Sequence, residues 1–126
     1  MSENEIATKV IGLAIGVHKI LGPGLLKSAY KECLYFKIVQ SGLSVIKEKP
    51  LPLVFEEVKL DCSYRIDLVV MNKLVVEIKC IDKLADIHTS QTLTYLKLGE
   101  YKLGLLINFN ELLLKNGIKR IINGSL

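Results

Sequence analysis

The sequence has little of several residue types that build large cores or covalent frameworks. Its 126 residues include no tryptophan, three phenylalanines, three prolines and three cysteines. With so few large aromatic side chains, the hydrophobic core has to consist mainly of Leu, Ile and Val. An odd number of cysteines without CxxC spacing indicates neither a disulfide framework nor a zinc site. A reducing compartment is the default for such a chain, so we expect a cytoplasmic protein.

Long hydrophobic runs and a strong net charge are also missing. No apolar run approaches the roughly 20 residues of a membrane-spanning helix, and the polar, acidic start MSENE differs from a secretory signal. We therefore expect no membrane partner. The net charge of +4 permits a polyanionic partner without requiring one. The length corresponds to one domain, which we expect to span residues 1–126.

The segment from Tyr64 to Cys80 has the pattern of a β-hairpin. Two aliphatic runs flank a short polar break at residues 71–73. Because side chains alternate between the two faces of a strand, each face can be listed from the sequence. The first face is wholly aliphatic and should be buried: Ile66, Leu68, Val70, Leu74, Val76 and Ile78. The second face carries Arg65, Asp67, Val69, Val75, Glu77 and Lys79.

A three-residue turn centred on Asn72 predicts which side chains of the second face meet. Asp67 then lies opposite Glu77, and Arg65 opposite Lys79, with Cβ atoms about 4.5–5.5 Å apart. Two carboxylates this close repel each other, whereas a divalent cation between them makes the arrangement favourable. The hairpin alone also allows a solvent-exposed charge ladder, in which Arg65 and Lys79 neutralise the two acids.

Hydrophobic periodicity and turn residues predict the elements around this hairpin. Ser2 and Glu5 form a capping box at the start of the first helix, and Gly22 and Pro23 end it. The second helix is apolar on most sides, so we expect it between the first helix and the sheet. Helices are expected at 5–21, 25–41 and 85–98, and strands at 44–60, 65–70, 74–79, 102–109 and 118–122. The segment 44–60 is expected to be interrupted by its two prolines and to turn at Glu56 and Glu57.

Five sequence blocks, in this order, resemble the small GxxExxY-type proteins of the PD-(D/E)xK nuclease superfamily. They are GPGLLKSAY at 22–30, RIDLVV at 65–70, EIK at 77–79, HTSQTLTYLKL at 88–98 and LGLLINFN at 103–110. The resemblance covers most of the chain. It implies a restriction-endonuclease-like α/β fold with an αβββαβ core, in which helices flank a mixed sheet.

The resemblance also implies a Mg²⁺- or Mn²⁺-dependent nuclease that hydrolyses phosphodiester bonds in DNA. Asp67, Glu77 and the backbone carbonyl of Ile78 are then the metal ligands. Lys79 assists the attacking water, and Gln91 positions groups at the centre. By analogy alone, a chain this small can form a homodimer that grips both strands.

Five further side chains are candidates for nucleic-acid contact. They are Lys27, Lys31, Arg65, His88 and Tyr95. For Lys27 and Lys31 the basis is a basic stripe on one side of the second helix. His88 is alternatively an exposed helix residue, and Tyr95 alternatively a core residue with its hydroxyl at the rim.

One position departs from the family motif. Gly24 and Tyr30 match it, but Lys27 stands where relatives have a metal-centre glutamate, and a cation there lowers affinity for a divalent ion. Three interpretations remain open. The protein is an active enzyme that needs only Asp67 and Glu77, a weakened or inactive nuclease-fold module that still binds nucleic acid, or the product of a deliberate charge change.

Overall fold

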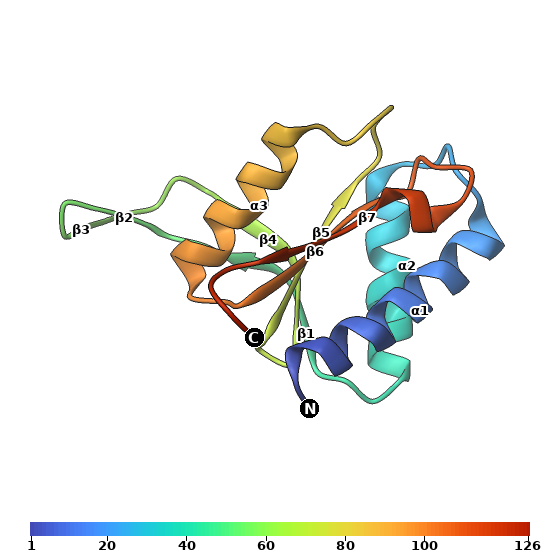
Figure 1. The fold of residues 1–126 in the computed structure, drawn as a ribbon, viewed down its shortest axis with the longest axis horizontal. Helices are drawn as coiled ribbons and strands as arrows, with labels where there is room; N and C mark the ends of the chain where they lie inside the picture. Colours follow the sequence, from blue (N-terminus) through green and yellow to red (C-terminus); the bar gives the residue numbers. More distant parts are fainter.

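A mixed five-stranded sheet forms the centre of the computed structural model, which describes residues 1–126 (Figure 1). The strand order is β1-β4-β5-β6-β7, and only β5 and β6 run parallel. The strands are β1 (Val45–Pro50), β4 (Arg65–Val70), β5 (Leu74–Lys79), β6 (Leu103–Asn108) and β7 (Ile118–Ile122). This confirms the predicted α/β class and is consistent with a restriction-endonuclease-like core.

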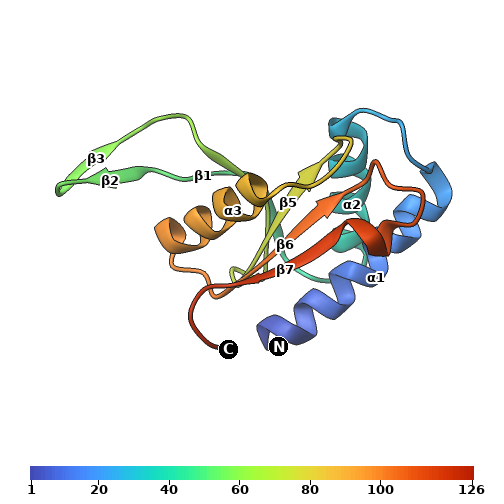
Figure 2. The same ribbon diagram turned by 45° about the horizontal axis from the view of Figure 1, so that its top comes forward.

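Helices cover both faces of the sheet (Figure 2). α1 (Glu3–Leu21) and α2 (Lys27–Gln40) lie on one face, and α3 (Asp86–Gly99) lies on the other. The predicted capping box is present, because the Ser2 hydroxyl accepts from the Glu5 N–H and the Glu5 carboxylate accepts from the Ser2 N–H. None of these helices is both long enough and apolar enough to span a membrane.

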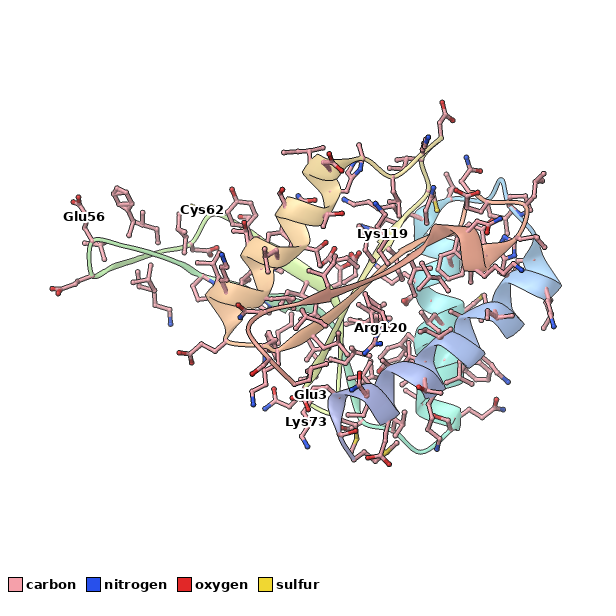
Figure 3. All side chains as sticks on the ribbon, in the orientation of Figure 1. Glu3, Glu56, Cys62, Lys73, Lys119 and Arg120 are labelled. Atoms are coloured by element: carbon pink, nitrogen blue, oxygen red, sulfur yellow. The ribbon has the colours of Figure 1, made fainter.

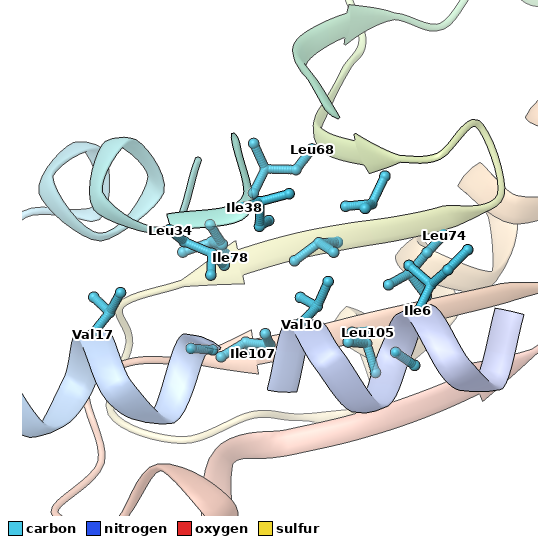
Figure 4. Packing of buried hydrophobic residues seen from close by; sticks show 14 of the residues in the cluster. Ile6, Val10, Val17, Leu34, Ile38, Leu68, Leu74, Ile78, Leu105 and Ile107 are labelled. Atoms are coloured by element: carbon cyan, nitrogen blue, oxygen red, sulfur yellow. The ribbon is translucent and has the colours of Figure 1, made fainter. Parts of the chain in front are cut away.

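The larger hydrophobic core lies between the sheet and the first two helices (Figure 4). Ile6 and Val10 of α1 pack there against aliphatic side chains of β5 and β6. As predicted, α2 contacts both α1 and the sheet, but only part of its apolar surface is buried there. Only Tyr30, Leu34 and Ile38 of α2 are buried, whereas Phe36 is 60% exposed. These three are spaced four residues apart, so the helix buries one narrow stripe.

The β4–β5 hairpin has the predicted register over its last three pairs. Leu68 pairs with Val76, and Val70 pairs with Leu74. All six residues of the aliphatic face are buried, but Val69 and Val75 of the other face are buried as well. The expected face of Ile66 was wrong, because it packs with Val69 and Val75 in the second core, to which α3 contributes.

The predicted interrupted segment at 44–60 forms three strands, divided near the prolines and at the predicted turn. β1 ends at Pro50, and β2 (Leu53–Phe55) and β3 (Val58–Leu60) form a separate two-stranded hairpin. We call residues 53–60 the arm; it projects from the body of the molecule (Figures 1 and 2). β1 remains paired as far as Pro50, opposite Arg65, and Pro52 lacks the N–H that would continue the ladder.

Candidate active site

Asp67 and Glu77 lie where the β4–β5 ladder opens. Regular pairing stops at Leu68 and Val76, one residue short of the two acids. Their carboxylates take backbone donors of the opposite strand instead. The Ile78 N–H donates to Asp67 Oδ2 at 2.8 Å, and the Asp67 N–H donates to Glu77 Oε1 at 3.3 Å.

The ladder on the other side of β4 is interrupted at the same level. Lys47 and Lys49 of β1 pair with Leu68 and Ile66, but Glu48 between them has a φ of 57° and is not paired with Asp67. Asp67 therefore has irregular pairing on both flanks. A side chain freed from the regular pleat in this way can be aimed independently of its strand neighbours.

Both carboxyl groups are buried, and burial changes the charge of Glu77. Asp67 and Glu77 are each 5% exposed. Burial raises the pKa of the Glu77 carboxyl to about 8, and the negative charge of Asp67 adds to the shift. In the metal-free protein Glu77 therefore carries a proton at neutral pH. The alternative of an exposed charge ladder does not describe this pair.

Lys27 reaches the acidic pair from the first residue of α2. Its Nζ lies 3.0 Å from Asp67 Oδ1, and its side chain is 43% exposed. The preceding loop is held by Tyr30, whose hydroxyl donates to the Gly22 carbonyl at 2.5 Å and accepts from the Leu25 N–H at 3.1 Å. Lys31 instead forms an ion pair with Glu48, so only Lys27 of the basic stripe contacts the acids.

A chain of hydrogen bonds leads from Lys79 to α3. Lys79 Nζ donates to Gln91 Oε1 at 3.2 Å, and Gln91 Nε2 donates to the Tyr95 hydroxyl at 3.3 Å. Burial raises the pKa of the Tyr95 hydroxyl, and the charge of Glu77 adds to the shift, so Tyr95 keeps its proton. Gln91 therefore connects α3 to the ammonium of Lys79, which lies on the same strand as Glu77.

Arg65 and His88, the remaining predicted contact residues, form only local hydrogen bonds and do not contact the acidic pair. Arg65 is exposed and donates to the neighbouring Tyr64 carbonyl at 2.9 Å. His88 Nδ1 accepts from the Ala85 N–H at 2.9 Å and so caps the start of α3. The other ring nitrogen of His88 is not needed for that cap.

The acidic pair fits a single hard divalent cation. The two carboxyl groups are buried together, and the pKa of one is strongly raised, so a bound cation would take the place of the Glu77 proton. The Ile78 carbonyl projects from the same strand edge as the N–H that reaches Asp67. No cluster of three or more His, Cys, Asp or Glu side chains is present, so waters and phosphate oxygens would complete the shell, as Mg²⁺ commonly requires. Lys27 competes with such an ion for Asp67 Oδ1.

Sequence reasoning missed two residues that shape this region. Tyr64 lies beside Tyr95, with ring centroids 6.0 Å apart, although the two are 31 positions apart in the sequence. Asn108 is fully buried, and its side chain binds the N–H and the carbonyl of Ile81 at 3.1 and 2.9 Å. It fixes the chain just after Lys79, and nothing in the local pattern distinguishes it from an ordinary strand-end asparagine.

Comparison with known proteins gives one match. The sequence model of the PD-(D/E)XK nuclease superfamily matches residues 4–121. No curated protein and no solved structure matches significantly.

Proposed function

Because the chain belongs to the PD-(D/E)XK nuclease superfamily, we propose that it hydrolyses phosphodiester bonds in DNA with Mg²⁺ or Mn²⁺. The observation that carries this proposal is the buried pair Asp67 and Glu77 at the open end of the ladder, where each carboxylate accepts a backbone N–H of the other's strand. Burying charged groups is costly, so two acids seldom lie buried side by side for stability alone. Metal-dependent hydrolysis, in contrast, uses such a pair to hold the ion.

Asp67, Glu77 and the Ile78 carbonyl would hold the ion. When bound, it would offset charge on the phosphate oxygens and lower the pKa of the attacking water. Glu77 has to lose its proton to become a ligand, and a bound cation favours that loss. The hydrogen bond from Ile78 N–H keeps the Asp67 carboxylate turned toward Glu77.

Lys79 is the group that orients the attacking water and stabilises negative charge on the phosphate. Gln91 accepts from its ammonium at 3.2 Å and limits the positions that the flexible side chain adopts. Such a positioned amine contributes about 10²–10⁴-fold to a hydrolysis rate.

Phosphate contacts come from exposed cations and donors near the pair. Lys27 and Arg65 are both solvent-accessible at its rim, and His88 and Tyr95 present donors from α3. Lys31 contributes least, because its ammonium is already paired with Glu48.

The proposal is tested by incubating DNA with the purified protein in Mg²⁺, Mn²⁺ or chelator. We expect cleavage only with a metal, abolished by Asp67→Asn and reduced about 10²–10⁴-fold by Lys79→Met. Lys119→Met is a matched control, because Lys119 is exposed and lies outside the site. Cleavage in chelator, or full activity in both site variants, would contradict the assignment.

A second candidate function is a nucleic-acid-binding module without catalysis. The observation that favours it is the Lys27 ammonium at Asp67 Oδ1, where it opposes a metal ion. This alternative predicts DNA affinity that falls with salt, because phosphate contacts release counterions, and no turnover with any metal. The same cleavage assay on Lys27→Glu separates the two, since gain of activity identifies the lysine as the block.

A further inference from the structure

A small hollow lies beside the candidate active site, between the base of the arm and α3. Its volume is about 220 Å³. It is lined by Leu53, Tyr64, Gln91, Thr94, Tyr95 and Leu98. This is smaller than the roughly 300–1,000 Å³ that drug-sized ligands fill. The hollow therefore suits one compact, flat group and not an extended ligand.

Gln91 connects the hollow directly to the residues proposed to act on phosphate. One side of its amide accepts from Lys79, and the other donates to the Tyr95 hydroxyl. A ligand group in the hollow is thus separated from the Lys79 ammonium by one glutamine side chain. A nucleotide has a matching arrangement, because its flat base and its charged phosphate are attached to the same sugar.

The lining combines aromatic surface with polar groups that can each form a further hydrogen bond. The Tyr64 and Tyr95 rings are tilted by 54° and not stacked on each other, and Tyr64 is 42% exposed, so ring surface is available. The Tyr95 hydroxyl accepts from Gln91 and retains its own proton to donate. The Thr94 hydroxyl donates to the Ser90 carbonyl and retains lone pairs to accept. Flat rings and mixed polar edges match a nucleobase.

The charges of the arm disfavour a sugar-phosphate backbone on this side. Glu56 and Glu57 form its turn, and Asp61 follows it directly, with Lys59 as the single opposing charge. Glu56 is at the tip of the arm, away from the body (Figure 3). A duplex that continued along the arm would bring its phosphates toward these carboxylates, whereas a single base meets no such repulsion.

We propose that this hollow binds an unpaired nucleobase next to the phosphate at the acidic pair. The substrate class is accordingly single-stranded DNA or duplex DNA with a single-stranded extension. This inference rests on the proposed function and names the substrate of that site. A paired base inside a duplex reaches the hollow only after unstacking, which costs a few kcal/mol, whereas an unpaired base stacks on an aromatic ring regardless of its identity.

The test combines a change in the protein with a change in the DNA. Affinity is measured by fluorescence anisotropy in Ca²⁺ for three probes: a short single strand, the same strand in a blunt duplex, and the single strand with abasic positions. The variants are Tyr64→Ala, Tyr64→Phe and, as a matched aromatic control on the nearby arm, Phe55→Ala, whose side chain is 55% exposed outside the hollow. Cleavage of the intact single strand in Mn²⁺ is followed in parallel.

Binding is expected to be tightest for the intact single strand. Tyr64→Ala should weaken that binding roughly fivefold to a hundredfold, the range of one lost base–aromatic stack, while Tyr64→Phe and Phe55→Ala leave it unchanged. On the abasic strand and the blunt duplex, Tyr64→Ala should have no effect.

Two outcomes would overturn the inference. Equal weakening of all three probes by Tyr64→Ala, or no weakening of any, means that no base occupies the hollow. If Asp67-dependent cleavage persists in that case, the proposed function stands and only the inference fails. Absence of both binding and cleavage for the wild-type protein removes the two together.

Discussion

At the scale of single residues, the proposed hydrolysis depends on two acids that are buried next to each other. Asp67 and Glu77 lie on adjacent strands with 5% exposure each. The hairpin register already predicts that they face each other. It does not predict that Asp67 departs from the regular pleat. That departure accompanies the positive φ of Glu48 in β1, which lies next to β4 in the sheet but far from it in the sequence.

The raised pKa of Glu77 predicts how stability depends on pH in the metal-free protein. The folded state keeps a proton on Glu77 up to about pH 8, whereas the ordinary value is 4.5. The folded state therefore binds more protons across this interval, so the stabilisation is complete below about pH 4.5 and is lost as pH rises toward 8. We expect the free energy of unfolding to fall by on the order of 3 kcal/mol across this interval.

Urea unfolding of the wild type and of Glu77→Gln, in chelator at several pH values, checks this. The Glu77→Gln variant has no titratable proton at this position, so its free energy of unfolding should not show the decline that Glu77 causes. Parallel curves for the two proteins between pH 5 and pH 8 would show that Glu77 titrates normally.

At the scale of elements, the loop before α2 decides where Lys27 lies. Tyr30 is fully buried and stacks on Phe109 at 4.6 Å between ring centroids. Its hydroxyl joins the carbonyl of Gly22 to the N–H of Leu25. Tyr30 therefore stabilises the turn between α1 and α2, a role that its position in the sequence does not reveal.

Removing this hydroxyl leaves two backbone groups without their partner. Tyr30→Phe should destabilise the protein by about 1–3 kcal/mol, the usual cost of unpaired buried polar groups. Thermal unfolding gives the measurement. Tyr35→Phe is the control, because Tyr35 is only half-buried and lies under the Lys47 ammonium. Equal melting temperatures for the two variants would show that the Tyr30 hydroxyl contributes nothing.

The sequence predicted most elements at this scale, and the failures have physical causes. The final strand at 118–122 and the turn at 71–73 follow from hydrophobic runs with polar breaks, and the structure confirms both. The turn at Glu56 and Glu57 was predicted, but not that the strands beside it form a separate hairpin outside the main sheet, because their apolar residues are exposed: Val54 and Val58 are 59% and 55% accessible. Hydrophobicity predicts burial only where another element is available to cover the residue.

At the scale of the whole molecule, the site lies at one end of the sheet and the termini lie near the other. Lys73, in the turn of the central hairpin, donates to the Met1 carbonyl at 2.7 Å. The acids lie at the opposite end of the same hairpin. Both termini are close together in two views (Figures 1 and 2). Tags or fused partners at either terminus should therefore leave the candidate active site accessible.

The proposed function requires Asp67 and Glu77 to hold a divalent cation together. Anomalous scattering from a crystal grown with Mn²⁺ locates such an ion. We expect one peak between the two carboxylates, with the Lys27 ammonium displaced from Asp67 Oδ1. A well-ordered site without such a peak, and with Lys27 still bound to Asp67, would show that the two acids do not bind a metal ion.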